Sequence, residues 1–200
     1  MIRIIVLLSV LFAPLRQDKV IHVLFVGNSL TYTNNLPSIV RTMAKEKGVK
    51  LQIKTLAFPD YAFEDHWNDG HLQKFINSGK FDFVIVQQGP SSMQEGRLML
   101  YEFGKKIKTL CDENNTTLGF FMVWPARVNY STFDGVIKNY SETATQLEAL
   151  LFPVGERWKI HFDTTQDFSY YGADGFHPSV QGSKVAAAVI TQGLEAAINN

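Results

Sequence analysis

Strand-like and helix-like segments alternate along this sequence from residue 20 to its end. Short runs rich in β-branched and aromatic residues cover 20–26, 50–57, 82–87, 118–124 and 159–163. Apolar residues at helical spacing cover 37–47, 72–77, 97–114, 132–151 and 178–198. Such alternation is typical of βαβ units, in which each helix carries the chain back so that the next strand pairs in parallel. The pattern predicts an α/β fold, a flavodoxin-like three-layer α/β/α sandwich with about five parallel strands.

The length of the chain predicts a single domain. Its 200 residues, 46% of them hydrophobic, can form one sizeable core and are too few for two comfortable ones. No repeat or linker divides the sequence. In an open parallel sheet, ligands bind beyond the carboxyl ends of the strands. Side chains that directly follow a predicted strand are therefore the first candidates for a functional site, although the fold class alone says nothing about chemistry.

The first segment of the chain has the features of a signal peptide. Arg3 is followed by an apolar run up to Ala13 that is too short to span a bilayer. We therefore expect residues 1–16 to be a signal peptide, residues 17–200 to form the domain, and the protein to be secreted or periplasmic. The alternatives are a buried N-terminal strand and an uncleaved anchor.

The charge balance argues against a nucleic-acid partner. The sequence has 19 Lys and Arg against 19 Asp and Glu, and no basic stripe stands out. An uncharged small molecule or a carbohydrate fits this composition better as a substrate. Cys111 is the only cysteine, so no intramolecular disulfide can form and the core alone must hold the fold.

A serine follows the first predicted strand, in the segment Gly27-Asn28-Ser29-Leu30. This position presents a hydroxyl at the carboxyl edge of the sheet, where main-chain N–H groups of the turn can face an anion. Gly27 allows a sharp turn because it has no side chain. Ser29 is therefore a candidate nucleophile. The alternative is that Asn28 and Ser29 are ordinary turn and capping residues.

A carboxylate and an imidazole stand three residues apart before the last predicted helix, as Asp174 and His177. A serine hydroxyl becomes a good nucleophile when an imidazole takes its proton and a carboxylate fixes the imidazole tautomer. In this interpretation Asp174 orients and His177 is the base. The alternative is a capping aspartate beside a solvent-facing histidine. We expect Pro178 in the first turn of the helix, where an N–H is not needed.

Together and in this order, the two segments resemble the first and last motif blocks of the SGNH hydrolase superfamily, the GDSL-type esterases and lipases. The serine segment is similar to the first block, with Asn28 where Asp is commoner, and the Asp-Gly-Phe-His-Pro segment is similar to the last. The resemblance spans residues 20 to about 188. It implies an α/β/α fold and ester hydrolysis without a cofactor or metal, with Ser29, His177 and Asp174 as the catalytic residues.

The resemblance also implies an oxyanion hole, and here the chain departs from the family. The family uses the N–H of the serine, a glycine of a second block and an asparagine of a third. No glycine stands where the second block has one, and Asp60 is the nearest match, able to serve through its main-chain N–H. In the third block Gln88 offers an amide in place of the asparagine, with Ser91 as the positional rival.

Trp124 and His66 each allow a functional and a structural interpretation. Trp124 follows the fourth predicted strand, so it either stacks against a sugar ring or packs in the core. His66 has Asp65, Asp69 and His71 nearby. We expect it to pack or to line a cleft rather than to bind a metal, because these residues lie on a turn and a short helix without cysteine ligands.

The sequence thus predicts a serine esterase that hydrolyses carboxyl esters through an acyl-enzyme. A small acyl group such as acetyl on a carbohydrate is the first substrate candidate, before short-chain lipid or aryl esters. The competing hypothesis is a non-catalytic carbohydrate-binding protein that kept the fold and lost the oxyanion hole. A phosphoryl-transfer or nucleotide-binding α/β protein is disfavoured, because neither glycine-rich nucleotide motif occurs at a strand-to-helix turn.

Overall fold

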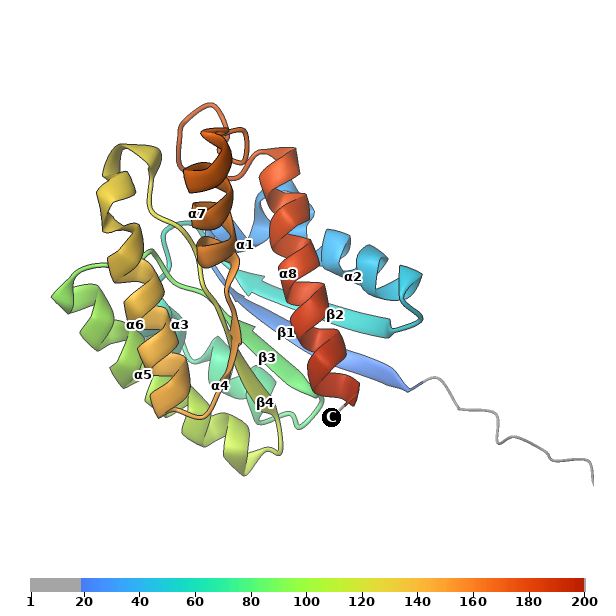
Figure 1. Ribbon diagram of the computed structural model, residues 1–200. Helices are drawn as coiled ribbons and strands as arrows, with labels where there is room; N and C mark the ends of the chain where they lie inside the picture. The colour runs from blue at the N-terminus through green and yellow to red at the C-terminus, as the bar shows by residue number, and fades with distance from the viewer. Residues whose placement is uncertain (1–18, 200) are drawn as a thin grey trace, which may run out of the picture.

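The computed structural model describes residues 19–199, so the predicted signal peptide lies outside the described residues. Five strands form one parallel sheet in the order β2-β1-β3-β4-β5 (Figure 1). The strands are β1 (Val20–Gly27), β2 (Lys50–Ala57), β3 (Phe83–Val86), β4 (Thr117–Phe121) and β5 (Leu150–Phe152). The predicted α/β class with five parallel strands between helical layers is confirmed.

Helices cover both faces of this sheet. Helices α2 and α8 pack together on one face, α3, α4, α5 and α6 gather on the other, and α7 contacts both α6 and α8 (Figure 1). The helices are α1 (Ser29–Tyr32), α2 (Leu36–Glu46), α3 (Phe63–Asn68), α4 (His71–Ile76), α5 (Gln94–Glu113), α6 (Phe133–Gln146), α7 (Val154–Thr165) and α8 (Val180–Asn199), with 3-10 turns η1 (Thr33–Asn35) and η2 (Arg127–Thr132). Within residues 19–199, no helix has the length and apolar character that a membrane span requires.

The central strands are buried on both sides, whereas the edge strand β2 is not. Val23 and Phe25 of β1 and Val84 of β3 are 0% exposed, as expected for parallel strands covered by helices on both faces. In β2, Gln52 and Lys54 are exposed. They lie on the same face because side chains alternate along a strand. The helical layer therefore leaves part of this face of β2 uncovered.

The sequence prediction of the fifth strand at residues 159–163 is wrong. Those residues lie inside α7, where Trp158 and Phe162 stand four positions apart and are both 0% exposed. The fifth strand, β5, occupies the end of the segment predicted as one helix at 132–151. A short apolar run fits either period, and the buried aromatic face of α7 decides in favour of the helix.

The last helix begins two residues later than predicted, at Val180 rather than at Pro178. Pro178 instead forms an isolated antiparallel bridge with Tyr171. The Ser179 hydroxyl accepts a hydrogen bond from the N–H of Gly182 at 3.1 Å and so caps the helix. The bridge closes the loop between Tyr171 and Pro178, which carries the predicted Asp-x-x-His pair.

Candidate active site

Ser29 is the first residue of the short helix α1, just after β1 ends at Gly27. Asn28 has an extended backbone and caps this helix, because its side-chain oxygen accepts from the N–H of Leu30 at 3.1 Å. The N–H of Ser29 lies in the first turn, where a main-chain N–H has no acceptor inside its own helix. The hydroxyl and the N–H of Ser29 therefore stand together at the carboxyl edge of the sheet.

A buried carboxamide that the sequence prediction did not include holds this turn. The side-chain oxygen of Gln87 accepts from the N–H of Asn28 at 3.1 Å and from the hydroxyl of Thr31 at 2.8 Å. A Cβ on Gly27 would lie 2.4 Å from that oxygen, so this close approach requires the glycine. Gln87 is 0% exposed. A polar residue at the end of a buried strand was the available sequence signal.

His66 contacts the same turn through the carbonyl of Gly27, which lies 2.8 Å from its Nε2. Because a carbonyl only accepts, Nε2 carries the proton, and Nδ1 has no hydrogen-bond partner within the described chain. Burial lowers the pKa of His66, while the hydrogen bond to Gly27 acts in the opposite direction. The side chain is 0% exposed, so of the two expected roles it packs and does not line a cleft.

Asp174 and His177 lie in line with the hydroxyl of Ser29. The Nε2 of His177 is 2.9 Å from Ser29 Oγ, and its Nδ1 is 2.6 Å from Asp174 Oδ2. Asp174 Oδ1 accepts from the N–H groups of Phe176 and His177, each at 2.9 Å. The hydrogen bond from the His177 ring, followed by that from Phe176, holds the pKa of the Asp174 carboxyl below its ordinary value. The carboxylate is therefore ionised at neutral pH and fixes a proton on Nδ1.

The segment after β4 fastens the loop that carries His177. The indole N–H of Trp124 donates to the carbonyl of Phe176 at 2.9 Å. The hydroxyl of Tyr171 donates to the carbonyl of Pro125 at 2.8 Å. Because both bonds join the core to the loop, the position of the imidazole depends on the packing of the sheet as well as on the loop itself.

Trp124 belongs to the core. It is 0% exposed and stacks on Trp158, with ring centroids 3.6 Å apart. No face of its indole is open to a sugar ring. Of the two interpretations of Trp124 given above, core packing is therefore the correct one, and its polar atom serves the loop at residues 171–178.

The side chain of Gln88 forms its hydrogen bonds with groups of the protein itself, and these bonds use the N–H groups that an oxyanion donor would need. Its amide nitrogen donates to Ser91 Oγ at 2.8 Å and to the carbonyl of Gly96 at 3.2 Å, and its oxygen accepts from the N–H of Phe63 at 3.4 Å. Ser91 Oγ in turn donates to the carbonyl of Gly89 at 3.0 Å. The donors of both side chains are thus used within the connection between β3 and α5 and the first turn of α5, and Gln88 is 2% exposed.

Asp60 lies in the exposed turn after β2, with a φ of +60°. The side-chain amide of Asn28 donates to the carbonyl of the next residue, Tyr61, at 3.0 Å. This bond ties the turn to the residue that caps α1. The main chain next to Asp60 is thereby tied to the serine turn.

A cavity of about 580 Å³ lies between the loops that follow β3 and β4. Phe176, the neighbour of His177, forms part of its wall together with Pro125. Ser92, Asn129 and Thr132 contribute polar groups. None of the lining residues in the described chain carries a charge, so this cavity suits an uncharged group that has hydroxyls or short apolar parts.

No family model and no curated protein matches the chain. Solved structures do. A candidate SGNH hydrolase from Slackia heliotrinireducens is 21% identical, with a TM-score of 0.73 over 88% of this chain and 100% of the other. A lipase/acylhydrolase from Enterococcus faecalis is 15% identical, with a TM-score of 0.72 over 88% and 96%. A variant of an acetyl-xylooligosaccharide esterase from Geobacillus stearmophilus is 13% identical, with a TM-score of 0.66 over 86% and 93%. The likeness is one of fold.

Proposed function

We propose that this chain, which has the fold of the SGNH hydrolases, is a serine ester hydrolase. The observation that carries the proposal is the hydrogen-bonded line from Asp174 through His177 to Ser29 Oγ. The three groups are those of a serine nucleophile and its base: an ionised carboxylate, an imidazole whose Nε2 can accept the hydroxyl proton, and a hydroxyl that follows the end of a strand. Because many unrelated functions use this fold, the geometry of these three residues, and not the fold, supports a hydrolase.

In the proposed reaction, Ser29 Oγ attacks the carbonyl carbon of an ester while His177 Nε2 takes the hydroxyl proton. The tetrahedral intermediate collapses when His177 delivers that proton to the leaving alcohol oxygen, which leaves an acyl group on Ser29. Water then attacks the acyl carbon and gives a proton to His177, which returns it to Ser29 Oγ as the acid departs. Asp174 keeps its negative charge throughout and stabilises the imidazolium.

The oxyanion would be held by main-chain donors. We assign the N–H of Ser29, which has no acceptor in its own helix, and the N–H of Asp60, whose turn is tied to Asn28. A donor of this kind does not depend on the side chain. Gln88 could act as a third donor only by exchanging its bond to Ser91 or Gly96.

A small acyl ester of a carbohydrate is the substrate class we propose. The cavity between the loops after β3 and β4 has no charged lining residue in the described chain, and it combines the hydroxyls of Ser92 and Thr132 and the amide of Asn129 with the apolar Phe176, whose ring centroid is 5.3 Å from that of His177. These groups suit sugar hydroxyls and a short acyl chain. One protein with the same fold is an acetyl-xylooligosaccharide esterase.

We also propose that the protein is exported, with residues 1–16 removed. Expression of the full chain in a bacterial host, followed by N-terminal sequencing of the exported protein, checks this. Export with a new N-terminus near residue 17 is expected. Retention of the whole chain in the cytoplasm would contradict it.

The test of the hydrolase is the intact mass of the protein after treatment with a fluorophosphonate. We expect one adduct, which Ser29→Ala abolishes and His177→Ala slows by several orders of magnitude, because the hydroxyl then lacks its base. Ser131→Ala is the matched control, since Ser131 is exposed and outside the triad, and it should label like the parent. A labelled parent justifies a panel of acetylated sugars and aryl esters.

The competing function is carbohydrate binding without catalysis. The observation in its favour is that the side chains of Gln88 and Ser91 donate their hydrogen bonds to other groups of the protein. If a folded sample forms no adduct and binds acetylated oligosaccharides, the hydrolase hypothesis is contradicted and the carbohydrate-binding function is supported.

A further inference from the structure

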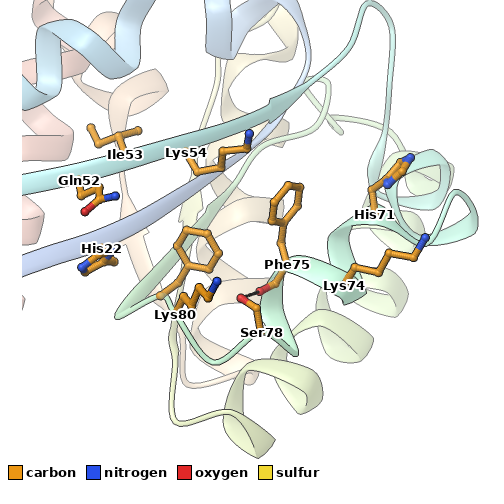
Figure 2. A pocket seen from close by; sticks show the side chains of 10 residues that line it. His22, Gln52, Ile53, Lys54, His71, Lys74, Phe75, Ser78 and Lys80 are labelled. Atoms are coloured by element: carbon orange, nitrogen blue, oxygen red, sulfur yellow. Dashed lines mark hydrogen bonds between the residues drawn. The ribbon is translucent and has the colours of Figure 1, made fainter.

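A second cavity, of about 850 Å³, lies toward the opposite end of the sheet from Ser29. His22 and Gln52, the third residues of β1 and β2, line it together with Lys54 on the uncovered face of β2. Helix α4 forms the other side and contributes Lys74 (Figure 2). The volume is within the range of about 300–1,000 Å³ typical of small-molecule sites. We call this cavity the lysine groove.

Three ammonium groups surround the lysine groove, those of Lys54, Lys74 and Lys80. None of them forms an ion pair in the described chain, and no carboxylate is among the described lining residues. The acidic side chain next in sequence, Asp82, already accepts from the ammonium of Lys19 at 2.9 Å. The groove therefore concentrates positive charge that the protein itself does not neutralise, although the chain as a whole is neutral.

Two aromatic rings form the apolar part of the lysine groove. Phe75 and Phe81 meet edge to face, with ring centroids 6.3 Å apart, and the ammonium of Lys54 lies 5.4 Å from the centroid of Phe75. Figure 2 shows the ring of Phe75 between the strand residues and α4. Such rings offer a flat apolar surface. A ligand that fits the groove therefore combines negative charge with an apolar face that can lie on these rings.

We propose that the lysine groove binds an acidic oligosaccharide. Its uronate carboxylates pair with the lysines, and the C–H faces of its sugar rings lie on Phe75 and Phe81. The three lysines come from a strand, a helix and the connection before β3, and Figure 2 shows their ammonium groups well apart from one another. They therefore match negative charges spread along a chain better than a single small anion. This proposal does not depend on esterase activity.

Other polyanions fit the lysine groove less well. A membrane surface would need exposed apolar side chains beside the lysines to insert between lipids, and no lining residue in the described chain is among the exposed large hydrophobic residues. A nucleic acid would need a longer basic surface than a single groove on a chain of zero net charge.

The test is isothermal titration calorimetry of the folded protein with a galacturonic acid oligomer, in the Ser29→Ala background so that hydrolysis cannot contribute. We expect saturable binding that weakens as salt is added. Lys54→Gln/Lys74→Gln should lower the affinity at least tenfold, and Lys54→Arg/Lys74→Arg should retain it. Lys45→Gln/Lys184→Gln is the matched control, because it removes two exposed charges from α2 and α8 on the other face.

Four results would overturn the proposal: no binding at millimolar oligomer, equal affinity for a neutral galactose oligomer, equal loss of affinity in the control variant, or binding of inorganic phosphate or anionic phospholipid vesicles in preference to the uronate. All the lysine variants change exposed side chains, so circular dichroism should confirm that they fold. A failure here leaves fluorophosphonate labelling of Ser29 unchanged, which separates it from a failure of the proposed hydrolase.

Discussion

His66 binds the carbonyl of Gly27 from a fully buried position, below the turn that presents Ser29. A second proton would have to be placed on Nδ1, which has no acceptor in the described chain. Burial lowers the pKa of His66, because the charged imidazolium would be removed from water. Between the lowered pKa of the folded state and the ordinary value near 6.5, the unfolded chain binds more protons than the folded one, so stability rises with pH.

We therefore expect the free energy of unfolding to fall as the pH is lowered below 6.5, with a contribution from His66 of at most about 1.4 kcal/mol per pH unit. His66→Gln should remove this part of the pH dependence, because the glutamine amide can still donate to the carbonyl of Gly27 but does not titrate. Urea denaturation of both proteins between pH 5.5 and 7.5 measures it. Parallel stability curves for the two would contradict the assignment.

At the scale of elements, the loop between Tyr171 and Pro178 is not an independent structure. It is closed by the bridge between these two residues and anchored to the segment after β4 by Trp124. Asp174 organises the loop internally through two main-chain N–H groups. The imidazole of His177 therefore takes its position from β4 and the core as much as from its own neighbours.

Trp124→Phe tests this anchoring. The change removes the N–H that binds the carbonyl of Phe176 and keeps a ring in the core. We expect a loss of stability of about 1–3 kcal/mol and a fall of roughly tenfold in kcat on a reactive ester, with KM little changed, because the imidazole would be less well placed. A purely structural role would leave kcat of the folded fraction at the parent value.

The packing of α8 against the same region depends on a glycine. A Cβ on Gly182 would lie 2.2 Å from the carbonyl oxygen of Tyr170 and 2.7 Å from the ring of Trp158. At Gly182, α8 lies so close to Tyr170 and Trp158 that even a methyl side chain would not fit. This contact sets how closely α8 lies to the loop at residues 171–178.

Gly182→Ala should lower the free energy of unfolding by about 1–3 kcal/mol, because backbone and a packed ring would have to shift. Gln181→Ala on the same helix changes an exposed residue and should stay within about 0.5 kcal/mol of the parent. Urea denaturation compares the two. Equal stabilities would show that α8 can move away without loss of packing.

In the whole molecule, the candidate active site and the lysine groove occupy opposite ends of the sheet. From His22 to Gly27 the chain rises five residues along β1, about 16 Å. Sites at such a separation without shared partners usually behave independently. Binding of an oligosaccharide in the lysine groove therefore does not require a substrate in the candidate active site.

We therefore expect Lys54→Gln/Lys74→Gln to leave the rate of fluorophosphonate labelling at Ser29 within about twofold of the parent. The labelling rate measured by intact mass over time is the readout. A decrease of tenfold or more in a folded variant would show coupling between the two ends that the contacts do not provide.

The sequence by itself determined the fold class and identified the serine turn and the last loop as the candidate site. Alternation of the two periods predicts the parallel sheet, and β2 (Lys50–Ala57) occupies the predicted range. Ser29, Asp174 and His177 were candidates because of their places beside a predicted strand and a predicted helix, and because the two segments together resemble motif blocks of the SGNH hydrolases. Patterns of this kind are encoded by neighbouring residues, so they are readable before folding.

Only the tertiary structure decided the features that depend on distant partners. The fifth strand was misplaced because its short apolar run fits two periods, and packing of Trp158 in α7 settles the choice. The hydrogen bond from Asn28 shows that Gln87 supports the serine turn. The hydrogen bond to Ser91 shows that Gln88 belongs to the loop after β3. The lysine groove likewise unites residues of β1, β2 and α4, whose proximity arises because the helical layer leaves that edge of the sheet uncovered.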